Sequence, residues 1–240
     1  MIDAFKRASA RSVTAVMPYY GYARQDRKDR PRVPISARLI ANLLEAAGID
    51  RLLTMDLHAP QIQGFFTVPV DNLYSFPVLV NYFKSIKLEN PVVVSPDAGG
   101  VERARMMANA ISADLAMVYK KRIFPNEVAE SILIGDVEGK DAIIIDDMVD
   151  TAGTLVKTVE LLKSKKAKRI WAACTHPVLS GEAVERIKSS PLEALIVTDT
   201  IVIPKEKLID KIKVLSVANL FAEAIKRIFE QSSVSSIFAI

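Results

Sequence analysis

The sequence has 240 residues, of which half are hydrophobic, so it can form one large domain or two small ones around a sizeable core. Its 32 basic and 28 acidic side chains leave a net charge of +4, which is modest for this length. The basic side chains cluster in residues 24–32, 120–122 and 163–169, and anionic small-molecule substrates explain such clusters as well as a nucleic acid does. We therefore expect no nucleic-acid partner.

Cys174 is the single cysteine, which excludes an intrachain disulfide and any metal site built from several cysteines. The sequence contains no apolar run long enough to span a membrane, and its first residues do not resemble a signal peptide. We expect a cytoplasmic protein that makes no membrane contact.

Hydrophobic periodicity predicts strands and helices along the whole chain. The predicted strands are residues 13–17, 51–57, 91–95, 115–119, 142–145, 169–175, 194–198 and 213–217. The predicted helices are residues 1–10, 35–47, 72–84, a helix that ends near residue 111, 155–163, 180–187 and 217–229.

Residues 141–155 carry the strongest functional signal in the sequence. The β-branched run 142–145 predicts a buried parallel strand, and Asp146 and Asp147 follow it directly. Small and hydroxylic residues then lead into the next helix. In a parallel sheet, ligands bind beyond the carboxyl ends of the strands, and a loop that enters a helix N-terminus suits a phosphate group.

Thr151 and Thr154 add hydroxyl donors to this loop, whereas Asp146 and Asp147 would accept hydrogen bonds from sugar hydroxyls or hold a metal ion. A sugar phosphate with neighbouring hydroxyl groups fits both features, with its phosphate on the loop and its hydroxyl groups at the acidic pair. The alternative is structural, with Asp150 or Thr154 capping the helix and the acidic pair in a solvated loop. That alternative is preferred for any single residue, but it does not explain the run as a whole.

This run resembles the phosphoribosyl diphosphate-binding motif of the phosphoribosyltransferase-like family, and motifs elsewhere narrow the resemblance to the ribose-phosphate pyrophosphokinase family. The resemblance implies an α/β fold of two phosphoribosyltransferase-like (type I) domains with mostly parallel sheets. Ala152 stands where the family usually has a second glycine, and a position with positive φ tolerates alanine less well. By resemblance, the ribose 5-phosphate-binding residues are Asp97, Asp146, Asp147, Asp150, Thr151, Ala152, Gly153 and Thr154.

Two loops in the first third of the chain carry candidate nucleotide ligands. Residues 18–28 are rich in aromatic and basic side chains, which could stack on a base and pair with phosphates or could form a solvated surface. This loop resembles the family's nucleotide-binding loop, which implies that Arg24, Gln25 and Asp26 bind ATP. His58 follows a predicted strand and could be a metal or phosphate ligand or a buried histidine; the resemblance implies that it holds Mg²⁺ and ATP.

Two further segments complete the predicted site. Asp97 lies in a Ser-Pro-Asp-x-Gly-Gly run and could be a helix N-cap or a metal or ribose ligand; the resemblance places it at the Mg²⁺ and ribose 5-phosphate site. Residues 120–122 predict a cationic loop, which could be a solvated surface or could stabilise charge on transferred phosphates. By resemblance, Lys120 and Arg122 are catalytic.

The resemblance also implies the domain organisation. We expect an N-terminal domain of residues 1–80, joined by the C-terminal helix of residues 218–240, and a C-terminal domain of residues 81–217 that holds the ribose 5-phosphate site. Family members carry an additional N-terminal segment, and a first domain without it would expose a sheet edge.

The implied activity is transfer of the β,γ-diphosphoryl group of Mg-ATP to the anomeric hydroxyl of ribose 5-phosphate, giving phosphoribosyl diphosphate and AMP for nucleotide biosynthesis. The implied assembly is a homo-oligomer, a hexamer built from dimers. One alternative is a regulatory or catalytically impaired homologue. Another is a phosphoribosyltransferase that consumes phosphoribosyl diphosphate, although such a protein is not expected to carry the Arg-Gln-Asp and Asp-Leu-His runs.

Overall fold

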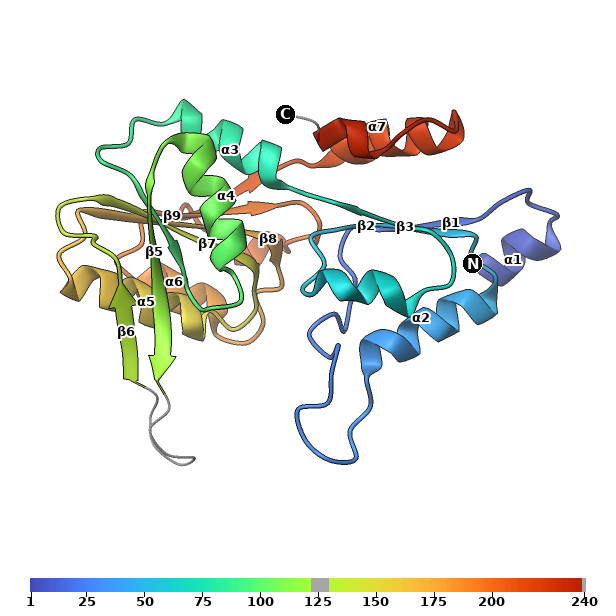
Figure 1. The fold of residues 1–240 in the computed structure, drawn as a ribbon, viewed down its shortest axis with the longest axis horizontal. Helices are drawn as coiled ribbons and strands as arrows, with labels where there is room; N and C mark the ends of the chain where they lie inside the picture. The colour runs from blue at the N-terminus through green and yellow to red at the C-terminus, as the bar shows by residue number, and fades with distance from the viewer. Residues whose placement is uncertain (122–129, 239–240) are drawn as a thin grey trace. The chain divides into compact units, whose positions relative to one another are not determined.

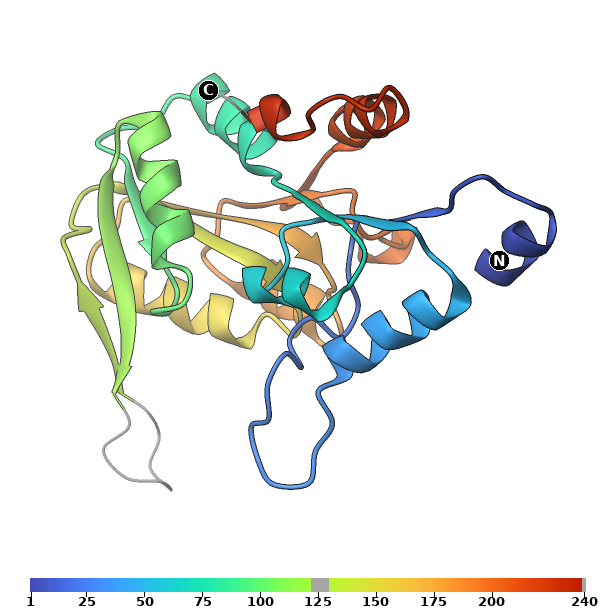
Figure 2. The ribbon, with the colours of Figure 1, turned by 45° about the vertical axis from the view of Figure 1, so that its right-hand side comes forward.

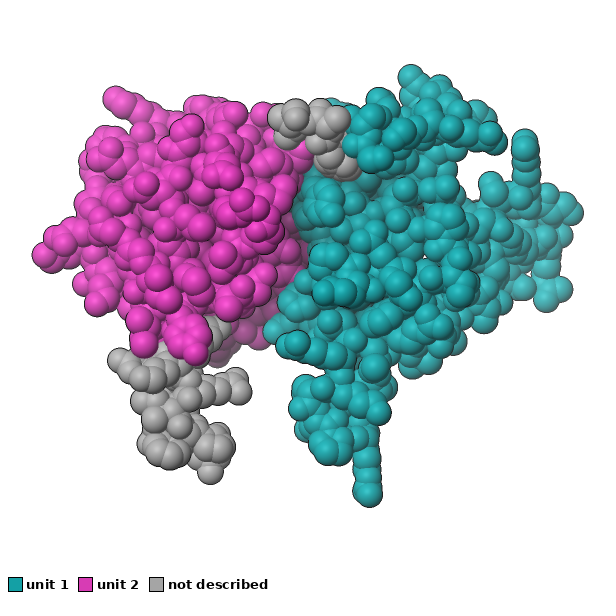
Figure 3. Space-filling model, in the orientation of Figure 1, with its two compact units in different colours: residues 1–75, 219–240 teal, residues 76–218 magenta. Residues whose placement is uncertain are grey.

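The computed structural model describes residues 1–121 and 130–238, apart from the side chains of residues 120, 121, 130 and 238. The chain divides into two compact units, coloured separately in Figure 3. Unit 1 consists of Met1–Ser75 and Asn219–Ile240, and unit 2 of Phe76–Ala218. In the two described ranges, every helix is too short or too polar to cross a lipid bilayer.

The described part of unit 1 contains a three-stranded parallel sheet in the order β1 (Thr14–Met17), β2 (Arg51–Met55) and β3 (Val70–Leu73). Helix α2 (Ser36–Ala47) packs on one face of it through Ala37 and Ala41, which belong to a buried cluster that includes Leu52. Gly48 ends α2 in the left-handed conformation at φ 100°, which a residue without a Cβ adopts at little cost. The helical elements assigned to this unit are α1 (Ile2–Arg7), α2 (Ser36–Ala47), η1 (Pro60–Phe65), η3 (Ser235–Phe238) and nearly all of α7 (Ala218–Phe229).

The described part of unit 2 contains a seven-stranded sheet in the order β10-β9-β8-β7-β4-β5-β6 (Figures 1 and 2). All neighbouring strands are parallel except β5 and β6. The strands are β4 (Val92–Ser95), β5 (Asp114–Lys121), β6 (Glu130–Ile134), β7 (Asp141–Val149), β8 (Arg169–Pro177), β9 (Ala194–Thr198) and β10 (Ile212–Leu215). The helices are α3 (Phe76–Ser85), α4 (Val101–Ile111), α5 (Gly153–Ser164), α6 (Ala183–Ser189) and the short 3₁₀ helix η2 (Lys205–Lys207).

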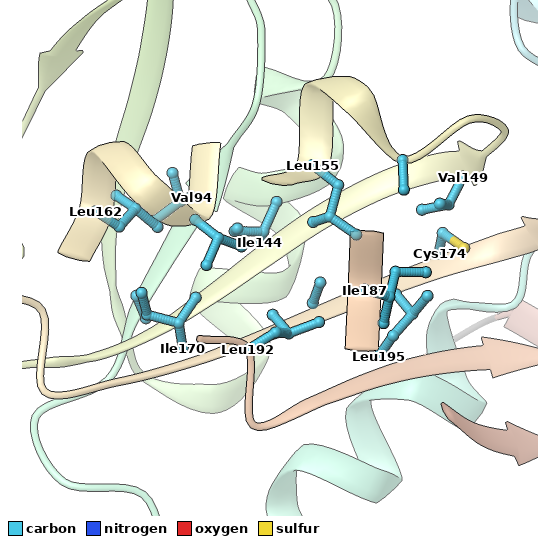
Figure 4. Close-up of a cluster of buried hydrophobic side chains, with 14 of the residues drawn as sticks. Val94, Ile144, Val149, Leu155, Leu162, Ile170, Cys174, Ile187, Leu192 and Leu195 are labelled. Atoms are coloured by element: carbon cyan, nitrogen blue, oxygen red, sulfur yellow. The ribbon is translucent and has the colours of Figure 1, made fainter. Parts of the chain in front are cut away.

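Helices cover both faces of this sheet, and the central strands are therefore continuous apolar runs. On one face, Leu155 and Leu162 of α5 pack beside Val94 and Ile144, as Figure 4 shows. On the other face, the buried side chains of α3 and α4 meet the alternate residues of the same strands, among them Ile143. The prediction of an α/β fold with mostly parallel sheets is confirmed.

The predicted helix over residues 72–84 is wrong at its start. Its first two residues belong to β3, which pairs in parallel with β2, and α3 begins only at Phe76. The Asn72 side chain accepts a hydrogen bond of 3.1 Å from the backbone N–H of Leu57, so a polar residue is useful in this short strand. The strand has no continuous apolar run, and this is why hydrophobic periodicity missed it.

The predicted loop directly after residue 119 is also wrong at its start. Strand β5 continues to Lys121, where it pairs in antiparallel register with β6. Strand β6 was not predicted. It lies at the edge of the sheet, where charged residues at a strand end are common because one side faces solvent.

Candidate functional site

Strand β7 presents the acidic pair at the carboxyl edge of the unit 2 sheet. Asp146 lies opposite Cys174 of β8, and the pairing continues to Val149 and Pro177. The acidic pair is thus inside the strand, which corrects the prediction that the strand ends at residue 145. The apolar run is shorter than the strand, because backbone pairing with β8, and not hydrophobicity, determines where β7 ends.

The two carboxyl groups are close together and poorly solvated. Asp147 is 4% exposed, and its backbone N–H donates a hydrogen bond of 2.9 Å to Asp146 Oδ1. Burial, and then the hydrogen bond and charge of Asp147, raise the pKa of Asp146 to about 7. Arg103 Nη1 on α4 lies 3.9 Å from Asp147 Oδ1, and its charge offsets only part of this rise. The pair can therefore accept donors from a ligand.

Burial also affects the thiol next to this pair. Cys174 is fully buried, and burial together with the charges of Asp146 and Asp147 raises its pKa well above the usual value. Two residues further along β8 lies His176. Its Nδ1 is 3.0 Å from Thr200 Oγ1, and both side chains are buried.

The turn from β7 into α5 contains a strained residue. Ala152 has φ 58° and ψ 7°, the left-handed conformation that disfavours residues with a Cβ. Asp150 is fixed before it, because Ser180 donates its backbone N–H to Asp150 O at 3.0 Å and its hydroxyl to Asp150 Oδ1. Thr151 and Thr154 are exposed.

Helix α5 starts at Gly153 directly after this turn. Its N-cap residue is Ala152, whose side chain makes no capping hydrogen bond. The N–H groups of a first helical turn have no partner inside the helix, and together with the positive end of the helix dipole they suit an anion.

The loop after β4 reaches the same edge of the sheet, because β4 and β7 are parallel neighbours. Asp97 Oδ1 accepts hydrogen bonds from the N–H groups of Gly99 (2.9 Å) and Gly100 (3.1 Å). A Cβ at Gly100 would lie 2.9 Å from Ser95 Oγ and 3.9 Å from the carbonyl oxygen of Ile145 on β7. Asp97 thus caps a tight turn that packs against the strand carrying the acidic pair.

The predicted nucleotide-binding residues lie in unit 1. Arg24 and Gln25 are exposed and Asp26 is half-buried in the loop after β1. The carbonyl of Gln25 accepts a hydrogen bond of 3.1 Å from Ala37 N–H, which ties this loop to α2. His58 is exposed in the loop after β2, and since β1 and β2 are parallel neighbours both loops leave the same edge of the sheet.

The two predicted catalytic residues are not described in full. The backbone of Lys120 pairs with Ser131 in β5 and β6, but its side chain is outside the described atoms. Arg122 lies outside the described residues. Their catalytic roles therefore stay predictions.

The predicted Mg²⁺ ligands, His58 and Asp97, belong to different units. Among the described residues, no group of three or more His, Cys, Asp or Glu side chains could hold a metal ion. A site with few protein ligands fits Mg²⁺, which keeps several waters and is usually bound by one or two carboxylates and substrate phosphates. Asp97, with one carboxylate oxygen bonded to the turn, fits such a site.

Sequence reasoning missed two arginines that approach the site. Arg103 lies in the first turn of α4, and Arg186 on α6 donates a hydrogen bond of 2.9 Å from Nη1 to the carbonyl oxygen of Thr151. For Arg103, the preceding Gly-Gly turn was a usable signal, because it starts a helix at the carboxyl edge of the sheet. For Arg186, 35 residues from Thr151 in the sequence, no local pattern gave a signal.

Comparisons with known proteins agree with this geometry. Residues 1–48 match the N-terminal domain of ribose phosphate pyrophosphokinase, and residues 120–239 match the phosphoribosyl synthetase-associated domain. Ribose-phosphate pyrophosphokinase of Bacillus caldolyticus is 57% identical over 238 residues, which are 99% of this chain and 76% of that protein. The Bacillus subtilis (strain 168) protein of the same name is 54% identical over 239 residues, 100% of this chain and 75% of that protein.

A solved structure gives the same result for the fold. The crystal structure of phosphoribosylpyrophosphate synthetase from Mycobacterium smegmatis matches with a TM-score of 0.91 and 44% identity, over 97% of this chain and 76% of that chain. In a parallel α/β sheet, a helix N-terminus beyond the carboxyl end of a strand is a common site for a phosphate group. The chain belongs to the ribose-phosphate pyrophosphokinase family, a family of enzymes, and the resemblance found in its motifs is confirmed.

Proposed function

We propose that this chain is a ribose-phosphate diphosphokinase that uses ribose 5-phosphate and Mg-ATP. The anomeric hydroxyl oxygen attacks the β-phosphorus, the bond from that phosphorus to the oxygen shared with the α-phosphorus breaks, and AMP leaves with that oxygen. The hydroxyl proton is released, and phosphoribosyl diphosphate is the second product. The observation that carries the proposal is the acidic pair of β7 followed directly by the first turn of α5.

Ribose 5-phosphate would occupy unit 2. Its 5-phosphate would accept hydrogen bonds from the backbone N–H groups of residues 151–154 and from the exposed hydroxyls of Thr151 and Thr154. Its ring hydroxyls would donate to Asp146 and Asp147. An ionised carboxylate is the stronger acceptor, so the raised pKa of Asp146 would make binding stronger as the pH rises through about 7.

The nucleotide would be bound by Arg24, Gln25, Asp26 and His58. Arginine suits this role because its planar guanidinium group pairs with phosphate oxygens in a fixed geometry. His58 and Asp97 would hold Mg²⁺, which when bound neutralises negative charge on the nucleotide phosphates.

Lys120 and Arg122 would stabilise the charge that develops on the phosphate oxygens during transfer. Pyrophosphoryl transfer needs little covalent chemistry from the protein, so positioning and electrostatic stabilisation supply most of the rate enhancement. A homo-oligomeric assembly and a cytoplasmic location stay predictions, and light scattering on the purified chain would measure the first of them.

The proposal is tested by mass spectrometry of the products after the purified chain is mixed with ribose 5-phosphate, ATP and Mg²⁺. The variants are Lys120→Ala and Asp146→Asn, with Lys84→Ala on the exposed surface of α3 as the matched lysine control. We expect phosphoribosyl diphosphate and AMP in equal amounts from the wild type and the control, and loss of both from the two site variants.

Two outcomes would contradict the proposal. A folded wild-type chain that binds ribose 5-phosphate but releases no AMP is a regulatory homologue. A chain that consumes phosphoribosyl diphosphate in the presence of a nitrogenous base, without needing ATP, is a phosphoribosyltransferase.

A further inference from the structure

We propose that Arg186 is a positioning residue for the 5-phosphate subsite, an inference that rests on the proposed function. Arg186 lies on α6, and its side chain contacts the turn between β7 and α5. Its Nη1 donates to the carbonyl oxygen of Thr151 at 2.9 Å, and the same atom lies 3.8 Å from the point where a Cβ on Gly153 would be. Its guanidinium group thus touches the backbone that is proposed to bind the phosphate.

The hydrogen bond to Thr151 determines the direction of a phosphate donor. The peptide between Thr151 and Ala152 is trans, so its C=O and N–H point in opposite directions. Because Arg186 holds the carbonyl on the α6 side, the N–H of Ala152 is directed to the opposite side of the turn. That N–H belongs to the proposed phosphate-binding set, and Arg186 fixes it without touching the phosphate.

Such a restraint is useful because the next residue is strained. Ala152 adopts φ 58°, a conformation that an L-residue with a Cβ leaves easily when nothing holds it. If the Thr151 carbonyl were released, the peptide could rotate and Ala152 could return to a more stable backbone region. The loop would then lose the convergence of its N–H groups.

Arg186 is itself held in place. Its Nη2 lies 2.9 Å from Oε2 of Glu182, the N-cap residue of α6. With the guanidinium group bonded on both sides, little side-chain entropy is lost when the phosphate arrives. Because the side chain is 42% exposed, solvent screens its direct attraction to the phosphate, and we expect positioning to dominate.

The chain offers a close control in unit 1. Arg227 on α7 makes the same two types of contact, with Nε 2.6 Å from the glutamate four residues earlier and Nη1 3.0 Å from the carbonyl oxygen of Ser233, and its Nη1 also donates to Ser236 Oγ. Its loop has no part in the proposed site. Arg227→Met therefore reports what the loss of such an arginine costs the fold alone.

The test uses calorimetric titration of the full chain with ribose 5-phosphate, for the wild type, Arg186→Met, Arg186→Lys and Arg227→Met. We expect Kd to rise about tenfold in Arg186→Met, as for the loss of one hydrogen bond from a charged donor, to recover partly in Arg186→Lys, and to stay within about twofold in Arg227→Met. In turnover, KM for ribose 5-phosphate should rise by the same factor, while kcat and KM for ATP stay within about twofold.

Equal Kd values for Arg186→Met and Arg227→Met would overturn the inference. So would a fall in kcat and a rise in KM for ATP in Arg186→Met to the same extent as the change for ribose 5-phosphate, because that pattern reports a general loss of structure. If the wild type binds ribose 5-phosphate but forms no product, the proposed function fails and the titration still decides the role of Arg186. If the wild type does not bind ribose 5-phosphate, both proposals fail.

Discussion

Strand β7 has acidic side chains at both ends, and the structure treats the two ends in opposite ways. At the amino end, Asp141 is fully buried and accepts bonds from Arg169 Nε (2.9 Å), Arg169 Nη2 (2.5 Å) and the backbone N–H of Glu89 (2.6 Å). Burial by itself raises the pKa of Asp141, but these bonds more than offset it, so the pKa is lowered. This end is fully neutralised by the protein.

At the carboxyl end, the charge of Asp146 is poorly stabilised. The Asp147 N–H donates to Asp146 Oδ1, Arg103 lies 3.9 Å from Asp147 Oδ1, and the pKa of Asp146 is raised to about 7. The same strand thus holds one carboxylate that stabilises the fold and one that costs stability when ionised. A carboxyl group whose pKa is raised by burial and a like charge is a candidate binding group. By this criterion Asp146 is such a candidate, whereas Asp141 stabilises the fold.

The largest expected effect is on the free energy of unfolding, at the amino end of β7. Asp141→Asn removes the charge opposite Arg169 and should lower the free energy of unfolding by about 3 kcal/mol, because it leaves a partly buried cation without its partner. The pKa of Asp141 is lowered in the folded state, so its contribution is present above about pH 4 and is lost as the pH falls through that range. Urea unfolding of unit 2 at pH 7 and pH 3.5 would measure both.

The control for this prediction is Glu102→Gln, which breaks the exposed pair with Arg105 on α4. Exposed pairs contribute little, so no measurable change is expected. If both variants lose the same stability, or if Asp141→Asn is as stable as the wild type at pH 7, the two ends of β7 do not differ in the way described.

The next effect has the opposite sign. The pKa of Asp146 is raised in the folded state, so between about pH 4 and pH 7 the folded chain keeps a proton that the unfolded chain has lost, and the free energy of unfolding falls as the pH rises. Asp146→Asn removes this penalty and should stabilise the chain by about 1–2 kcal/mol at pH 8 and by less at pH 5. Thermal unfolding at the two pH values is the measurement.

The same variant should lose affinity for ribose 5-phosphate, because an amide presents one acceptor oxygen in place of two charged ones. A variant that gains stability and loses binding would identify Asp146 as a binding group. Destabilisation at pH 8 would show that Asp146 is held like Asp141, and a gain that does not depend on pH would show that the pKa of Asp146 is not raised.

Local sequence patterns drew attention to the carboxyl end of β7 and not to its amino end. Asp146 and Asp147 stood out because two charges followed an apolar run, whereas Asp141 looked like an ordinary polar residue before a strand. Its partner Arg169 is 28 residues away, and only the pairing of β7 with β8 brings the two together. Long-range pairs of this kind leave no local pattern.

The same limit explains the missed elements. Strand β3 depends on pairing with β2, and β6 depends on antiparallel pairing with β5, so neither has a strong period of its own. Helix α2, by contrast, was predicted within one residue at its start because its apolar residues follow the helical period and Gly48 ends it. Local signals predicted elements and motif positions, and the contacts of Arg103 and Arg186 required the fold.

A smaller effect concerns the cation beside the pair. The charge of Arg103 lowers the pKa of Asp146, so Arg103→Met should raise that pKa further. The pH at which ribose 5-phosphate binding reaches half its full strength should move up by the same amount. Calorimetric titration from pH 6 to pH 9 would measure it, with Arg105→Met as the control. A shift to lower pH would contradict the assignment of Arg103.

The smallest effect is expected at Ala152, where three contributions nearly cancel. Ala152→Gly should release backbone strain of about 1–2 kcal/mol at φ 58°. It also adds the conformational entropy of glycine to the unfolded chain, about 0.5–1 kcal/mol, and removes a buried methyl group worth about 0.8 kcal/mol. We expect a change in the free energy of unfolding below about 0.5 kcal/mol.

Ser112, which ends α4 at φ 54°, is the matched control because its side chain is exposed. Ser112→Gly releases similar strain without losing a buried methyl group, so it should stabilise the chain by about 0.5 kcal/mol more than Ala152→Gly does. Urea unfolding of both variants measures the difference. Equal gains would mean that the Ala152 methyl group contributes nothing to the core, and the contacts of Arg186 and Ser180 with the turn would then matter more than the packing of Ala152.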